Sequence, residues 1–190
     1  DGAKGERAVQ GAALLALLGR RMGARVTVWS LGDEAAPMRE RIEERLAEMP
    51  FEGRTPIPTL WDRMPPRLEN GSLRFVVSDF LFPHDPSELR ERCARGAGGG
   101  AMIQILSRRE QTPPERGAVR LVDVETGEER QMAVDPDLAA RYRARLETLQ
   151  EGLAGACRVA GLGFAVLEAE RPLEESCRGP LLEAGVLAPA

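Results

Sequence analysis

Two kinds of apolar spacing alternate along this chain. Short runs rich in β-branched and aromatic residues are typical of strands, and apolar residues three or four apart are typical of helices. The runs predict strands over residues 24–32, 73–78, 101–106 and 162–170. Helical spacing predicts helices over residues 5–22, 34–49, 86–95 and 136–157, with a short helical turn near residues 59–64. The second of these helices is predicted from a stripe of Met38, Ile42, Leu46 and Met49.

Two of the predicted helices have clear start signals. Asp85 can cap the first turn, Pro86 suits the first helical position, and Glu88 stands where the partner of a capping box would lie. Asp135 and Pro136 repeat the same start before the longest helix. The beginnings of these two helices are therefore well defined by the sequence.

Alternating strands and helices predict an α/β fold, with a mainly parallel open sheet covered by helices on both faces. The segment "VRLVDVETGEERQMAVD" (119–135) is interpreted as an inserted β-hairpin with its turn near Thr126 and Gly127. Residues 171–190 are expected to form a loosely structured tail. We therefore predict one domain over residues 1–170, followed by a C-terminal tail over residues 171–190.

The composition of the chain limits which classes of partner and which cellular compartment are expected. With 43% hydrophobic and 29% charged residues and a net charge of −4, the chain argues against nucleic acid as its main partner. The apolar run over residues 11–18 is too short for a membrane span, which needs about 20 residues. The three cysteines, Cys93, Cys157 and Cys177, are widely spaced and read as reduced packing residues of a cytoplasmic protein.

Most common catalytic patterns do not fit. The glycines over residues 96–100 precede a strand, whereas a phosphate loop lies between a strand and a helix. A Ser-His-Asp hydrolase would have to use His84, the only histidine, which lies six residues after Ser78 without a nucleophile elbow. Acid-base catalysis by a pair of carboxylates stays an alternative, but no spacing of acidic residues identifies such a pair.

Asp79 is the strongest candidate site residue. It follows the apolar strand "RFVVS", and ligands of open α/β sheets bind beyond the carboxyl ends of strands. Because Asp85 is available as the helix cap, Asp79 is free for another role. Mg²⁺ favours carboxylate and hydroxyl oxygens, and Thr55 in the preceding loop offers a hydroxyl. The alternative is that Asp79 is a solvated loop acid.

Two segments carry a family resemblance. "GRTPIPTLWDRM" followed by "LRFVVSDFLFP" resembles the von Willebrand factor type A fold, a Rossmann-type sheet. The later half, with "LVDVETGE", "RYRARL" and a closing Gly-Phe strand, resembles an uncharacterised bacterial family of type A-like proteins. That family is usually encoded beside MoxR-type AAA+ ATPases. The resemblance covers roughly residues 5–170.

The resemblance implies a metal-ion-dependent adhesion site. Thr55 and Asp79 match its second and third segments, whereas the first segment, Asp-x-Ser-x-Ser after the first central strand, has no counterpart here. We therefore expect an N-terminally incomplete copy of the fold, without its first central strand. Glu110 and Asp123 are interpreted as ordinary loop and hairpin charges.

The expected function is that of a metal-ion-dependent protein-binding module rather than an enzyme. By resemblance, the partner would be a protein such as a MoxR-type AAA+ ATPase, in complex assembly or maturation, and the cofactor would be Mg²⁺. The alternatives are a hydrolase that uses Ser78 with Asp79, and a metal-free scaffold domain. A cytoplasmic location is expected, with membrane anchoring through a missing N-terminal segment left open.

Overall fold

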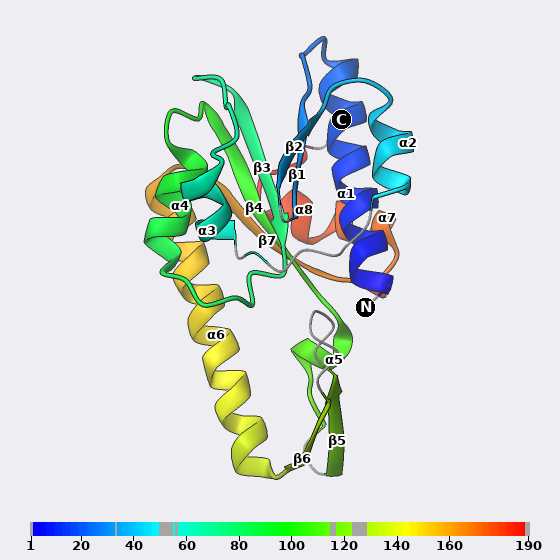
Figure 1. The fold of residues 1–190 in the computed structure, drawn as a ribbon, viewed down its shortest axis with the longest axis vertical. Helices are drawn as coiled ribbons and strands as arrows, with labels where there is room; N and C mark the ends of the chain where they lie inside the picture. The colour runs from blue at the N-terminus through cyan, green and yellow to red at the C-terminus, as the bar shows by residue number, and fades with distance from the viewer. Residues whose placement is uncertain are drawn as a thin grey trace.

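The computed structural model describes residues 2–32, 34–49, 55, 57–114, 117–122 and 129–188 (Figure 1). Its strands are β1 (Val28–Leu31), β2 (Ala35–Met38), β3 (Leu73–Ser78), β4 (Gly99–Leu106), β5 (Gly117–Val122), β6 (Glu129–Val134) and β7 (Gly163–Glu168). The longer helices are α1 (Gly2–Arg21), α3 (Ile57–Arg63), α4 (Pro86–Ala94) and α6 (Pro136–Val159). The shorter helices are α2 (Ile42–Ala47), α5 (Arg108–Gln111), α7 (Leu173–Arg178) and α8 (Pro180–Glu183).

The centre of the molecule is the parallel sheet β3-β4-β7, which confirms the predicted α/β class. Val76 pairs with Met102, and Met102 pairs with Phe164, so β4 has hydrogen-bonded neighbours on both sides. All residues of β4 from Ala101 to Leu106 are buried. A strand covered on both faces is expected to be apolar nearly throughout, and "AMIQIL" is apolar except for Gln104.

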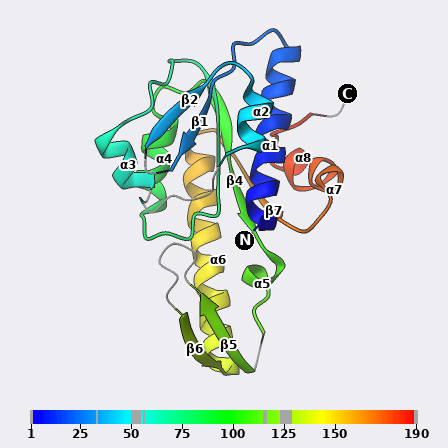
Figure 2. The ribbon, with the colours of Figure 1, turned by 45° about the vertical axis from the view of Figure 1, so that its right-hand side comes forward.

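Helices cover both faces of this sheet, as predicted. One face packs Ile103, Ile105 and Leu167 against Leu15 of α1 and Leu181 of α8. The other face packs Met102 in one core cluster with side chains of α4 and α6, which are Leu89, Cys93, Leu153 and Cys157. Figure 2 shows α1, α7 and α8 on one side of β4 and β7, with α4 and α6 on the other.

The predicted helix over residues 34–49 is wrong in its first half. Residues Ala35–Met38 form β2, which pairs antiparallel with β1, and the helix begins only at Ile42. The helical spacing gave a wrong prediction because these apolar side chains can be buried equally well from a strand or from a helix. Met38, Ile42 and Leu46 are all buried in a small cluster beneath α1, whichever backbone carries them.

The hairpin β1–β2 is a separate sheet in the described part of the chain. Here β1 bonds only to β2, and β3 bonds only to β4, so each strand has one unpaired edge.

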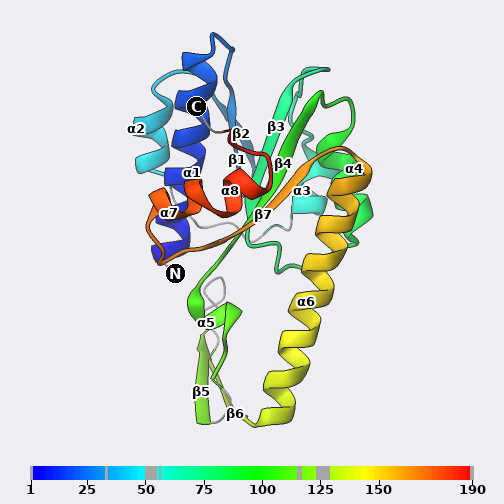
Figure 3. The same cartoon turned by 180° about the vertical axis from the view of Figure 1, so that it is seen from behind.

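The antiparallel pair β5–β6 confirms the predicted inserted hairpin, with Gly117 opposite Val134. Its expected turn at Thr126 and Gly127 lies outside the described residues. The hairpin and the first half of α6 project away from the sheet, as Figures 1 and 3 show. The carboxylate of Asp135 caps α6 by accepting the Leu138 N–H at 2.7 Å, as the sequence predicted.

The expected loose tail is instead folded over residues 171–188. It forms α7 and α8, and Leu181 of α8 is 2% exposed against the sheet. Val186 and Leu187 also pack on this cluster. The tail is ordered because its apolar side chains complete the cover of a face that would otherwise be exposed.

Candidate functional site

The loop after β3 turns Asp79 toward the surface. Phe80 has a positive φ of 54° and its side chain is fully buried, which fixes the chain reversal. The Ser78 Oγ accepts the Phe80 N–H at 3.1 Å, and the Asp79 Oδ1 accepts the Leu81 N–H at 3.2 Å. The Asp79 side chain is 36% exposed.

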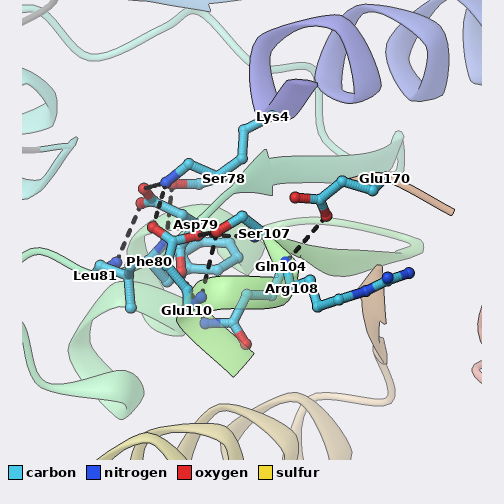
Figure 4. A network of polar contacts seen from close by, with 10 residues as sticks. All are labelled: Lys4, Ser78, Asp79, Phe80, Leu81, Gln104, Ser107, Arg108, Glu110 and Glu170. Atoms are coloured by element: carbon cyan, nitrogen blue, oxygen red, sulfur yellow. Dashed lines mark hydrogen bonds and ion pairs between the residues drawn. The ribbon is translucent and has the colours of Figure 1, made fainter. Parts of the chain in front are cut away.

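Lys4, near the start of α1, lies between two carboxylates (Figure 4). Its ammonium donates to the Asp79 Oδ2 at 3.1 Å and to the Glu110 Oε1 at 2.6 Å. Burial alone would lower the pKa of Lys4, but the bonds and charges of Glu110 and Asp79 outweigh it and raise the pKa above its usual value. The ammonium is therefore held charged at this junction of three segments.

Glu110 is held by its own helix turn. Its Oε2 accepts the Ser107 N–H at 2.8 Å, and the Ser107 Oγ accepts the Glu110 N–H at 3.3 Å, so the two residues form a capping box at the start of α5. Burial tends to raise the pKa of Glu110, but the bonds from Lys4 and Ser107 lower it overall. Glu110 therefore lies in a short helix rather than in a loop, and Lys4 joins it to Asp79.

A buried amide fixes the backbone under Asp79. Gln104, fully buried on β4, donates to the Asp79 carbonyl at 2.8 Å. The Gln104 Oε1 in turn accepts from the Gln150 Nε2 of α6 at 3.0 Å. An unpaired buried amide is costly, so this chain of bonds locks the end of β3 to both β4 and α6.

The predicted site residues share one cleft. Thr55, Ser78 and Asp79 all line it, together with Lys4 and Glu110. Asp123, the other acid considered from the sequence, lies outside the described residues. The sequence patterns did not identify Lys4, which is the only lysine of the chain.

The described residues do not by themselves form a metal centre. No group of three or more His, Cys, Asp or Glu side chains suited to a metal ion is found among them. Between Asp79 and Glu110, the position that a cation would take is filled by the Lys4 ammonium. A divalent ion at this place would have to displace Lys4.

Ser78 and His84 each contact the backbone of their own loop. The Ser78 Oγ accepts a hydrogen bond from the Phe80 N–H, and the His84 Nδ1 lies 2.7 Å from the Phe82 carbonyl oxygen.

None of the cysteines forms a disulfide, and burial raises the pKa of Cys93 to about 12. In the described ranges, no helix is long and apolar enough to cross a membrane.

Comparison with known proteins gives a family and nothing finer. No curated protein and no solved structure matches the chain. Residues 1–151, which include the Lys4, Asp79 and Glu110 site, match the family described as "Protein of unknown function DUF58". The chain therefore belongs to the DUF58 family.

Proposed function

We propose that this chain is a protein-binding module whose recognition site is the carboxyl edge of the β3-β4-β7 sheet. The observation that supports it is the meeting of Asp79 and Glu110, which follow the neighbouring strands β3 and β4. Both carboxylates converge on one ammonium at the rim of a cleft, and Asp79 keeps a third of its side chain exposed. Such a place is where ligands of open α/β sheets bind.

The partner proposed from the family resemblance is a MoxR-type AAA+ ATPase, in an assembly or maturation system. The test is co-purification of a MoxR-type AAA+ ATPase from the same organism with the wild type and with Asp79→Asn. We expect the variant to lose the ATPase. The matched control is Asp85→Asn, another exposed acid six residues away, which should retain it. Equal capture by the wild type and Asp79→Asn would contradict the proposed site.

Metal dependence is a separate part of the proposal. The resemblance assigns Asp79 and Thr55 to Mg²⁺, which would supply an open coordination position for a partner's carboxylate. Calorimetric titration of Mg²⁺ into the wild type, Lys4→Gln and Asp79→Asn tests this assignment. Binding that strengthens in Lys4→Gln and disappears in Asp79→Asn would support it.

The metal-free alternative is favoured by one observation, the position of the Lys4 ammonium between the two carboxylates. In that case Lys4 supplies the positive charge that holds the site together, and no external cation is needed. Absence of Mg²⁺ binding at millimolar concentration in all three proteins, with the ATPase still captured, would establish this form of the proposal.

A further inference from the structure

The segments at the amino end of the parallel sheet form one surface. Because β3, β4 and β7 run parallel, all three begin at this end. The end of α1 reaches the same place, where Arg25 bonds to Glu69 of the loop before β3 at 3.1 Å. Figure 1 shows the end of α1 and the starts of β3 and β4 far from the hairpin β5–β6. We call this surface the amino edge, and it consists of residues 20–27, 66–73, 95–98 and 158–162.

Three large apolar side chains protrude from the amino edge, each from a different segment. Val159 is 82% exposed, Met22 81% and Leu73 64%. The other exposed large hydrophobic residues of the described structure are at most 46% exposed. Single apolar side chains are ordinary on a protein surface, whereas apolar groups gathered at one place mark an interaction surface.

Positive charge gathers on the same segments. The amino edge contains six arginines and one glutamate, although the whole chain carries a net charge of −4. By contrast, five acids and three arginines stand in the segments that follow the three strands, which are residues 79–85, 107–114 and 168–171. Three of the amino-edge arginines pair with glutamates. The other three, Arg21, Arg67 and Arg158, are exposed and form no ion pair with any described residue.

We propose that the amino edge is a contact site for the surface of a membrane that contains anionic phospholipids. The arginines bind the phosphate groups of the lipids, and Met22, Leu73 and Val159 enter the boundary between head groups and acyl chains. Positive charge beside protruding apolar side chains is the combination that holds a protein at this boundary. An acidic protein or a nucleic acid would pair with the arginines but would leave the aliphatic side chains without apolar contacts.

This contact leaves the carboxyl edge of the sheet accessible. Asp79 and Glu110 lie at the other end of the strands, where a protein partner reaches them while the amino edge rests on lipid. The inference therefore goes beyond the proposed protein-binding function and does not rest on it. Variants of the amino edge should retain the protein partner, and Asp79→Asn should retain lipid binding.

Flotation with lipid vesicles tests the role of the arginines. The vesicles contain phosphatidylcholine alone or phosphatidylcholine with roughly 30% phosphatidylglycerol. Each arginine near an anionic surface strengthens binding about fivefold, so the double variant Arg21→Gln with Arg158→Gln should bind anionic vesicles about 25-fold more weakly than the wild type. The matched control, Arg141→Gln with Arg145→Gln, removes the same charge from exposed positions on the projecting half of α6. It should bind within about twofold of the wild type, because salt screens charges far from the lipid.

Tryptophan fluorescence tests the entry of the apolar side chains. Val159→Trp places a reporter at the amino edge, and Leu81→Trp places one in the loop after β3, at the opposite edge. The wild type, with Trp29 and Trp61, gives the background signal. On anionic vesicles the emission of Val159→Trp should move to shorter wavelength, whereas that of Leu81→Trp should change no more than the background.

Several outcomes would overturn the proposal. These are no binding to anionic vesicles, equal binding to neutral ones, an equal loss in the two double variants, or binding without a change in the Val159→Trp emission. Urea unfolding shows that each variant keeps its fold. Heparin, a polyanion without acyl chains, provides the last comparison. Binding to heparin but not to vesicles, weakened by Arg21→Gln with Arg158→Gln, would assign the amino edge to an acidic macromolecule instead.

Discussion

Replacing Lys4 with Gln removes the only cation that the described structure places between Asp79 and Glu110. Their two carboxylates would then face each other without a counter-charge, in a site where Lys4 and Glu110 are only 20% and 22% exposed. We expect Lys4→Gln to lower the free energy of unfolding at neutral pH. The loss should be larger than for an ordinary surface ion pair.

The size of the effect follows from the geometry. A hydrogen bond to a charged group contributes about 1.5–3 kcal/mol, whereas an exposed ion pair contributes roughly 0–1 kcal/mol. The contact with Glu110 belongs nearer the first class, because it is 2.6 Å long and largely shielded. The contact with Asp79 belongs nearer the second, because the Asp79 side chain is 36% exposed. Together these contacts predict a loss of about 2 kcal/mol.

The pH dependence gives a second readout. The pKa of Glu110 is lowered in the folded protein, so its stabilising effect is present above the ordinary value of 4.5 and is lost as the pH falls through the folded value. The difference between wild type and Lys4→Gln should therefore shrink in acid, below about pH 4.5. It should be largest near neutral pH.

Urea unfolding of Lys4→Gln, Glu110→Gln and the double variant measures the coupling between the two side chains. We expect a coupling energy of about 1–2 kcal/mol at neutral pH. The control is Arg25→Gln, because Arg25 and Glu69 form an ion pair whose side chains are 89% and 73% exposed. A coupling of zero, or a loss no greater than that of the control, would refute the reasoning.

Three further predictions concern the scaffold. Asp85→Ala should cost about 1 kcal/mol by urea unfolding through loss of the α4 cap, whereas Asp85→Ser should retain most of the stability. Gly100→Ala should prevent stable folding, as judged by circular dichroism, because its φ is +135° and a Cβ would lie 1.8 Å from a β3 carbonyl. Gly155→Ala in α6 has open space and should be neutral or stabilising. In the native protein, alkylation followed by mass spectrometry should find Cys177 modified well before Cys93, whose burial raises its pKa to about 12.

The central part of the fold was predictable because its signals are local. The strand over residues 73–78, the cap at Asp85 and the start at Pro136 depend on neighbours a few positions away. The errors concern segments whose structure is decided by distant contacts. Residues 35–38 form a strand because β1 lies opposite them, and residues 171–188 fold because they cover the sheet.

The candidate site was predictable only in part, for the same reason. Asp79 could be found because its place after a strand is visible in the sequence. Lys4 is 75 positions from Asp79 and 106 from Glu110, and no local pattern joins them. One signal was available, the sequence "SRRE" of a capping box at Ser107, which predicts an ordered rather than a solvated Glu110.

Lys4 is the single lysine of these 190 residues, so a lysine-directed reagent acts selectively at this site. An amine-acylating reagent finds just one ε-amino group in this sequence, and that group is protonated and held between two carboxylates. Its acylation rate therefore reports directly on how often the site opens. A bound partner that covers Asp79 should slow the acylation of Lys4. It should also slow the single cleavage that a lysine-specific protease makes at this residue.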